Sequence, residues 1–137
     1  MKILLDTNIV LDLLLARDPF VDDAQAIFIL VENRHIEGYL CADAITTIHY
    51  LVSRELGKHS ADNVIAKLLE IFEVTPVDKQ VLTEAARTHS TDYEDSVAYT
   101  SAYYAGVDRI ITRDQKGFKQ SKVPVLEPGE FLSFIAS

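Results

Sequence analysis

Short apolar runs alternate along this chain with longer segments in which apolar residues recur at helical spacing. Each short run is rich in Ile, Leu or Val and is bounded by polar residues, which is typical of buried strands. The clearest is "KILLD", which stops abruptly at an acid. The pattern predicts strands over residues 2–6, 38–42, 73–77 and 108–114, with a last short strand at the start of 123–135. Pro76 makes residues 73–77 an edge strand or a strand end.

The longer segments predict helices, because their apolar residues recur every three or four positions. A short helix follows the first strand through about Leu15, and others cover residues 21–35, 43–56, 60–72, 78–89, 90–106 and the end of the chain. The inward faces expected for two of them are Ala24, Ile27, Phe28 and Val31, and Val64, Ile65, Leu68, Leu69 and Phe72. Expected helix caps are Asp43, Ser60 and Asp78, with Gly57 as a stop.

This alternation of strands and helices predicts the α/β class. We expect a three-layer α/β/α arrangement around a central, mostly parallel sheet of four to five strands. The 137 residues contain no linker rich in Gly, Pro or Ser and suit one domain over residues 1–137. Ligands in such sheets bind outside the carboxyl ends of the strands. Polar residues that directly follow a strand are therefore the first candidates for chemistry.

Composition narrows the class of protein. Hydrophobic residues make up 48% and charged residues 25%, a mix typical of soluble globular proteins. No apolar run is long enough to span a bilayer, and the N-terminus lacks the features of a signal peptide. The single cysteine, Cys41, excludes an internal disulfide, so we expect a cytoplasmic protein. The net charge of -8 repels phosphate, so a nucleic-acid partner requires local basic patches or bound cations.

Acidic residues stand at three strand ends or helix starts. They are Asp6, the cluster Asp92, Glu94 and Asp95, and Asp114. Taken singly, each has a structural interpretation as a helix cap, a first-turn acid or a turn residue. Together they would meet at one edge of a parallel sheet, where a close pair repels by about 4 kcal/mol at an effective dielectric near 20. Mg²⁺ or Mn²⁺ would relieve that repulsion, and no Cys/His spacing suggests zinc.

Two motifs stand out, "LLDTNIVLDLLL" near the start and "DYEDSVAYTSAYYAGVDRIITRD" later, followed by the Phe of "KGF". Together they resemble the PIN domain, the nuclease fold of many VapC-type toxins. The late motif is similar to the branch of the family that reads Asp-aromatic-Glu-Asp. The resemblance implies a metal-dependent ribonuclease that uses Mg²⁺ or Mn²⁺, and the toxin component of a toxin–antitoxin pair.

The resemblance also implies roles for individual residues. Asp6, Asp95 and Asp114 match the family's metal-binding acids. Asn8 matches a polar residue that supports the first aspartate, and Thr112 is a small polar neighbour able to position ligands or water. These five residues form the core of the expected site.

One family acid is missing from this chain. The family usually carries it in the helix after the second strand, but here the segment "AITTIHYLV" that follows Asp43 contains none. Asp92 lies three residues before Asp95, on the same helical face, and is the candidate to supply the missing carboxylate. By the same geometry Glu94 is expected to point elsewhere, into solvent. His49 is either a weak metal ligand or substrate contact, or a partly buried histidine on an apolar helix.

Basic residues close to Asp114 are candidates for binding RNA. Within residues 112–122 they are Arg113, Lys116, Lys119 and Lys122. Phe118 either stacks on a base or turns into the core. Arg17 and the patch formed by Arg54, Lys58 and His59 are weaker candidates, because each resembles an ordinary helix end.

The expected partners are an RNA substrate, a cognate antitoxin bound on helices 21–35 and 60–72, and a second copy of the chain. Tyr99 and Tyr103 lie at i and i+4 and suit either the core or a dimer interface. The leading alternative is an inactive PIN-fold module that binds RNA or protein. A phosphorylated receiver domain would need a second acid near Asp6, and an aspartyl phosphatase would need an acid where Asn8 stands.

Overall fold

The computed structural model describes residues 1–137 and contains one sheet of five parallel strands. The strands lie in the order β3-β2-β1-β4-β5. Their bounds are Lys2–Leu5 for β1, Glu37–Cys41 for β2, Glu73–Thr75 for β3, Arg109–Ile111 for β4 and Val125–Leu126 for β5. The predicted α/β class and sheet of four to five strands are confirmed, and every strand pair is parallel.

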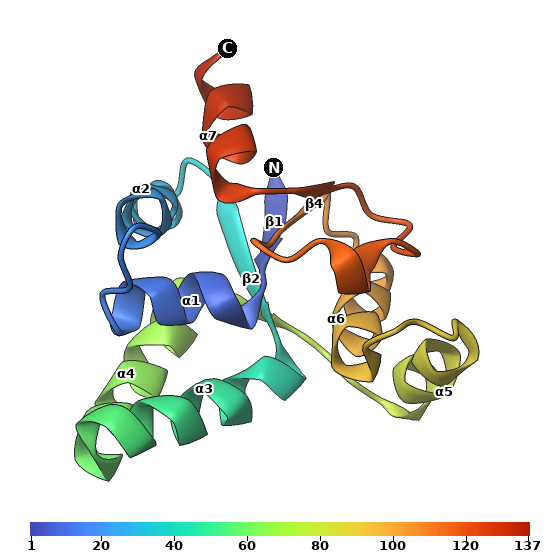
Figure 1. Ribbon diagram of the computed structural model, residues 1–137, viewed down its shortest axis with the longest axis horizontal. Coiled ribbons are helices and arrows are strands. Elements are labelled where there is room, and N and C mark those ends of the chain that lie inside the picture. The colour runs from blue at the N-terminus through green and yellow to red at the C-terminus, as the bar shows by residue number, and fades with distance from the viewer.

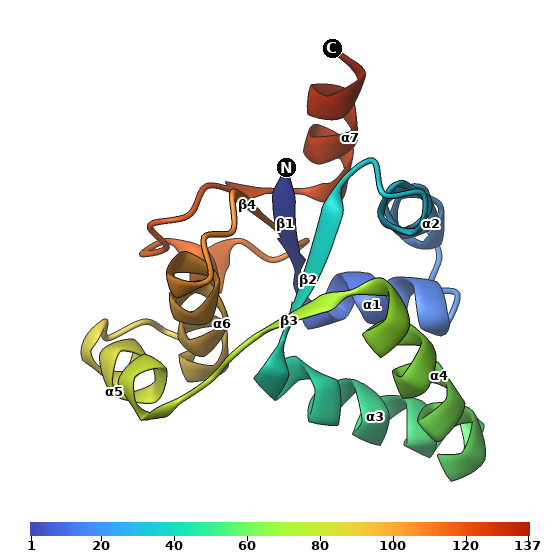
Figure 2. The same ribbon diagram turned by 180° about the vertical axis from the view of Figure 1, so that it is seen from behind.

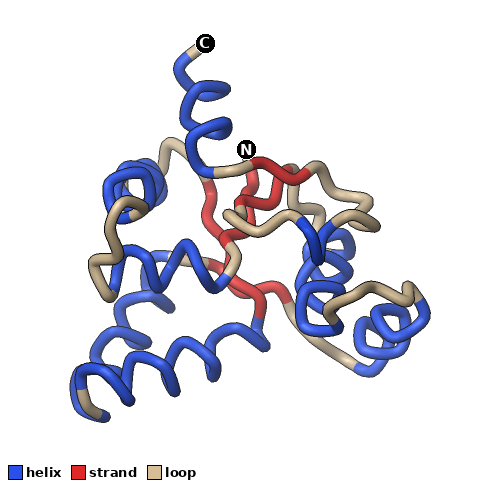
Figure 3. Tube along the Cα trace, in the orientation of Figure 1, coloured by secondary structure: helices blue, strands red, loops and turns tan.

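Seven α-helices cover the sheet. They are α1 (Thr7–Leu14), α2 (Val21–Glu32), α3 (Ala42–Leu56), α4 (Lys58–Ile71), α5 (Lys79–Arg87), α6 (Tyr93–Tyr104) and α7 (Pro128–Ala136). Figures 1 and 2 show α1 to α4 gathered on one side of the strands and α5 and α6 on the other. The trace in Figure 3 shows the strands running through the middle of the molecule, so the fold has the predicted three layers.

The central strand β1 is buried because both of its neighbours and both helical layers cover it. Ile3, Leu4 and Leu5 are at most 1% exposed, which explains why the sequence there is a continuous apolar run without alternation. The register pairs Ile3 with both Gly38 of β2 and Arg109 of β4. The carboxyl ends of three adjacent strands therefore meet at one edge of the sheet.

Several helix details confirm the expected pattern. In α2 the residues Ala24, Ile27, Phe28 and Val31 are all buried. Asp78 caps α5 by accepting a hydrogen bond from the Val81 amide at 2.9 Å. The edge position of β3 agrees with the proline that follows it.

Three other predictions about the helices were wrong. The helix α3 starts at Ala42, directly after β2, so Cys41 is the N-cap position and Asp43 lies inside the first turn. The helix α4 starts one residue after Gly57, whose φ of 89° favours glycine, so Ser60 is not the cap. Leu69 is half exposed because only part of the predicted apolar face of α4 reaches the core. The early start of α3 changes where Asp43 points.

The segment after β4 turns sharply because Thr112 bonds locally. Its hydroxyl accepts a hydrogen bond from the Asp114 amide at 3.1 Å, an arrangement that replaces strand pairing with a turn. A short 3₁₀ helix, η1 (Lys116–Phe118), follows and packs on α6. Phe118 is buried and lies 6.1 Å from the Tyr99 ring, so it belongs to the core and does not stack on a base. None of the helices is long and apolar enough to cross a membrane.

Candidate active site

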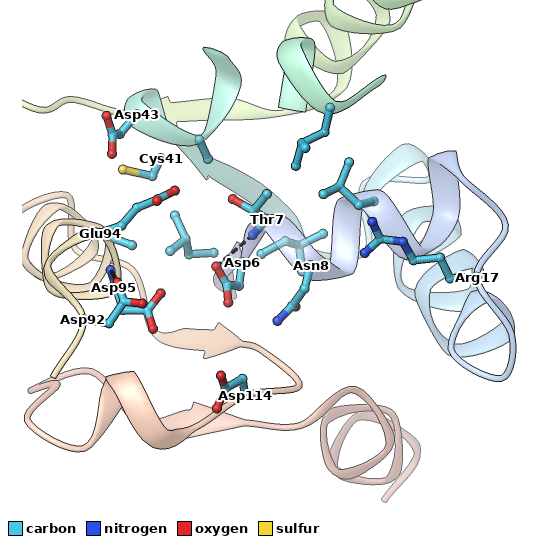
Figure 4. A pocket seen from close by; sticks show the side chains of 16 residues that line it. Asp6, Thr7, Asn8, Arg17, Cys41, Asp43, Asp92, Glu94, Asp95 and Asp114 are labelled. Atoms are coloured by element: carbon cyan, nitrogen blue, oxygen red, sulfur yellow. Dashed lines mark hydrogen bonds between the residues drawn. The ribbon is translucent and has the colours of Figure 1, made fainter. Parts of the chain in front are cut away.

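A pocket of about 320 Å³ opens at the edge of the sheet where β1 and β2 end. Six carboxylates line it, contributed by the end of β1, the start of α3, the start of α6 and the turn after β4. They are Asp6, Asp43, Asp92, Glu94, Asp95 and Asp114. Figure 4 shows these side chains around the carboxyl end of the central strands. The predicted acids are thus brought to one pocket, as the topology of a parallel sheet requires.

Asp6 joins the central strand to the first helix. Its backbone amide donates to the Ile111 carbonyl at 3.0 Å, which continues the pairing of β1 with β4. Its backbone is extended, and its Oδ1 accepts a hydrogen bond from the Thr7 amide at 2.8 Å, so Asp6 is the N-cap of α1. The capping interpretation of Asp6 is confirmed, and the same side chain also lines the pocket.

Thr112 is the residue that fixes Asp6 relative to the later part of the chain. Its hydroxyl is fully buried and donates to Asp6 Oδ2 at 2.7 Å. The same hydroxyl lies 3.4 Å from Asn8 Nδ2 and receives the Asp114 amide. We expected Asn8 to support Asp6, and it does so only through Thr112. The Asn8 Oδ1 atom is buried and has no hydrogen-bond partner.

Asp92 and Asp95 occupy the first turn of α6. Asp92 is the N-cap, and its Oδ1 accepts a hydrogen bond from the Asp95 amide at 3.0 Å. The Asp95 carboxylate lies against Gly117 of η1, whose Cα has no room for a side chain. A Cβ at position 117 would overlap with Asp95 Oδ2. The absence of a side chain at Gly117 therefore lets η1 approach the Asp95 carboxylate closely.

Burial, and after it the charges of neighbouring acids, raises the pKa of three of the pocket carboxyl groups. Burial first, and then the charges of Asp6, Asp92 and Asp114, raise the pKa of Asp95 from 3.8 to about 7. Burial also raises the pKa of Asp6, although hydrogen bonds from Thr112 and Thr7 oppose the shift. The pKa of Glu94 rises because of burial and because Asp43, Asp92 and Asp6 are near it.

No positive side chain forms an ion pair with any of these six acids. The ion pairs of the protein join Asp12 with Arg17 and Arg113, and Asp62 with His49 and Lys58, and none includes a pocket acid. Carboxylate and amide oxygens in an uncompensated cluster fit Mg²⁺ or Mn²⁺ in donor chemistry. No three of the Asp, Glu, His or Cys side chains lie close enough together to hold one ion as they stand. Binding would therefore draw the carboxylates inward.

Two of the pocket acids were not predicted as site residues. Asp43 was expected to be a helix cap, but α3 begins at Ala42 and its first turn directs Asp43 into the pocket. Glu94 is exposed as expected, yet it lines the pocket and does not point away from it. Figure 4 shows Glu94 and Asp43 on the same side of the pocket. Both lie at a helix start directed at the sheet edge, which is the signal that could have identified them.

The structure does not bring Arg113 into the pocket as an RNA ligand. Its guanidinium forms two hydrogen bonds to Asp12, with distances of 2.6 and 3.0 Å, and lies 3.8 Å from the centroid of the Phe20 ring. Asp12 is buried in α1, and a buried carboxylate requires such a partner. A charge that the sequence suggested for substrate is thus committed to attaching α1 to the turn after β4.

The remaining predicted contacts lie beside the pocket or away from it. Lys116 and Lys119 line a shallow hollow next to Asp114, outside the acidic pocket. His49 is 36% exposed and pairs with Asp62 of α4 at 2.7 Å, so it does not join the acids. Its pair links α3 to α4.

Comparisons with solved structures show the same fold at low sequence identity. The chain aligns with VapBC-1 of nontypeable Haemophilus influenzae with a TM-score of 0.71 and 17% identity, covering 94% of this chain and 99% of that one. VapBC2 of Rickettsia felis, solved with a DNA fragment from its promoter, aligns with a TM-score of 0.68 and 16% identity, covering 93% of this chain and 98% of that one. VapC20 of Mycobacterium tuberculosis, a toxin that cleaves the sarcin–ricin loop, aligns with a TM-score of 0.68 and 15% identity. The alignment covers 85% of this chain and 93% of that one.

No curated protein sequence matches the chain. The sequence profile of the PIN domain matches residues 2–116, which include both motifs that carry the resemblance and all six pocket acids. This chain belongs to the PIN domain family.

Proposed function

We propose that this PIN domain is a ribonuclease that hydrolyses RNA phosphodiester bonds with Mg²⁺ or Mn²⁺. The observation that carries the proposal is the pocket of six carboxylates with no paired cation at the carboxyl edge of the sheet. Such a cluster destabilises the protein unless a cation enters it. Family membership supports the same activity, because PIN nucleases generally use divalent metals.

Each residue of the pocket has a separate task in this proposal. Asp6, Asp95 and Asp114 would hold the ion. Thr112 fixes Asp6 relative to the turn at Asp114, because its hydroxyl bonds to both. The buried Oδ1 of Asn8 has no hydrogen-bond partner, and an ordered water beside Asp6 would satisfy it. The bound ion would lower the pKa of a water ligand and stabilise charge on the phosphate in the transition state.

The acid that the family carries in the helix after β2 has a substitute in this pocket. Asp92 is the earlier candidate, but one of its oxygens already caps α6. Asp43 stands in that same helix after β2 and lines the pocket, and after burial its charge is the next cause of the raised pKa of Glu94. We assign the fourth carboxylate to Asp43, with Asp92 contributing through its second oxygen.

The expected partners follow from the same family. The matched structures include toxin–antitoxin complexes, so we propose that this chain is the toxin of such a pair and binds a cognate antitoxin. RNA is the substrate that the pocket and the family suggest. A homodimer also remains our prediction; Tyr99 is buried in the core, whereas Tyr103 is exposed on α6 and available to a dimer interface.

A catalytically inactive binding module is the second candidate. Two observations favour it: no three acids are close enough to hold an ion, and α3 carries no acid beyond its first turn until Glu55. The two candidates differ in whether the pocket binds a metal ion and whether the loaded protein cuts RNA.

Titration calorimetry with Mn²⁺ should detect binding in the parent and lose it in Asp6→Asn and in Asp95→Asn, since each removes a shared ligand. The control Asp22→Asn removes an exposed acid outside the pocket and should bind Mn²⁺ like the parent. The parent and Asp22→Asn should also cleave single-stranded RNA, whereas Asp6→Asn and Asp95→Asn should not. Metal binding without cleavage would select the inactive module, and absence of both would reject the metal site.

Gly117→Ala should weaken Mn²⁺ binding by about 10- to 100-fold while the protein stays folded. The added methyl group collides with the Asp95 carboxylate, which has to shift from its present position in the pocket. Gly129→Ala is the matched control, because the nearest atom to its Cβ, on Asp23, is 3.8 Å away. Equal Mn²⁺ affinity of both variants in the same titration would show that Gly117 does not position Asp95.

The stability of the metal-free protein should fall as pH rises from about 4 to about 7. The folded state raises the pKa of Asp95 to about 7 from 3.8, so it binds more protons than the unfolded state in that window. Urea unfolding with EDTA should show this slope, and Asp95→Asn should reduce it. Saturating Mn²⁺ should reverse its sign, because protons compete with the ion. A slope that is unchanged in Asp95→Asn would contradict the origin assigned to it.

A further inference from the structure

The acidic pocket has one basic side chain among the residues that line it. Arg17, in the turn between α1 and α2, is the only Lys or Arg there. In Figure 4 its side chain extends toward Asn8 from the side opposite Asp43, Glu94 and Asp95. The two ends of the pocket therefore carry opposite charge, with carboxylates at one end and a guanidinium at the other.

The charge of Arg17 is left over after its acidic neighbour is neutralised. Asp12 is 1% exposed, and both of its oxygens accept hydrogen bonds from Arg113. Arg17 lies 3.9 Å from the same carboxylate, which is too far for a hydrogen bond, and its side chain is 40% exposed. Two guanidinium groups share one carboxylate, so a net positive charge remains on this wall, and it faces the pocket.

The backbone around Arg17 is fixed, which limits where the guanidinium can go. Its amide donates to the Asp12 carbonyl at 2.9 Å. Its carbonyl accepts from the Phe20 amide at 2.9 Å and from the Val21 amide at 2.8 Å. The side chain itself makes no hydrogen bond, so its donors are free to bind a planar or tetrahedral oxyanion in the pocket.

We propose that Arg17 binds a phosphate of the RNA strand at the end of the pocket opposite the carboxylates. The phosphate group is the oxyanion that the proposed function places there, so this inference rests on that function. The hollow lined by Lys116 and Lys119 lies beyond Asp114, so an RNA strand could meet positive charge on both sides of the acids. Arg17 acts on substrate binding and not on the metal.

Fluorescence anisotropy with a short labelled oligouridylate tests this role, with Ca²⁺ present to occupy the oxygen ligands. Arg17→Gln should weaken RNA binding by about tenfold or more. It should also reduce the slope of log K against log salt by about 0.7, the value for one phosphate contact on a single strand. Arg17→Lys should keep the slope and recover part of the affinity, because it retains the charge but loses the planar donors.

The matched control is Arg87→Gln, which removes an exposed arginine of α5 outside the pocket. It should leave both affinity and slope close to the parent values. Mn²⁺ titration of Arg17→Gln should match the parent, which shows that the pocket is intact. If the parent binds and cuts RNA while Arg17→Gln equals Arg87→Gln, this inference alone is overturned. If the parent neither binds nor cuts RNA, the proposed ribonuclease function fails and this inference fails with it.

Discussion

The hydrogen bond from the Thr112 hydroxyl to the Asp6 carboxylate is the contact on which the geometry of the site depends. It joins the end of β1 to the end of β4, two segments more than a hundred residues apart in sequence. Parallel pairing brings these ends together, and the buried hydroxyl then fixes Asp6 and the Asp114 turn at the same time. Without it, the two carboxylates would be free to move apart under their own repulsion.

Charge balance explains the rest of the arrangement. The acids at one end of the pocket form no ion pair, and burial together with their mutual repulsion raises the pKa of Asp95. At the other end, Asp12 neutralises Arg113 and leaves Arg17 with a free charge. A divalent cation beside the acids and a phosphate beside Arg17 would neutralise both ends. The net charge of -8 is then compatible with an RNA substrate.

Much of the fold and the central acids could be predicted from the sequence. The alternation of apolar runs with amphipathic segments is enough to indicate a parallel sheet, and strand ends of such a sheet meet, so Asp6, Asp95 and Asp114 were expected together. Asp43 was missed because aspartate favours cap positions, and one residue's difference in the start of α3 changes its role.

Long-range partners were beyond the reach of local patterns. Arg113 looked available because its partner Asp12 lies 101 residues away in sequence. A lone acid in the apolar run "NIVLDLLL" was the available signal, since a buried carboxylate needs a partner. The contact of Gly117 with Asp95 had no sequence signal, because it depends on how closely η1 packs on α6.

The most direct test of the central claim, that the carboxylates form one metal site, is crystallographic. Crystals grown with Mn²⁺ and measured at the manganese absorption edge should give an anomalous peak at coordination distance from oxygens of Asp6, Asp95 and Asp114. The carboxylates should have moved inward around it, while Thr112 still donates to Asp6. An empty pocket at saturating Mn²⁺, or a peak elsewhere on the protein, would contradict the account.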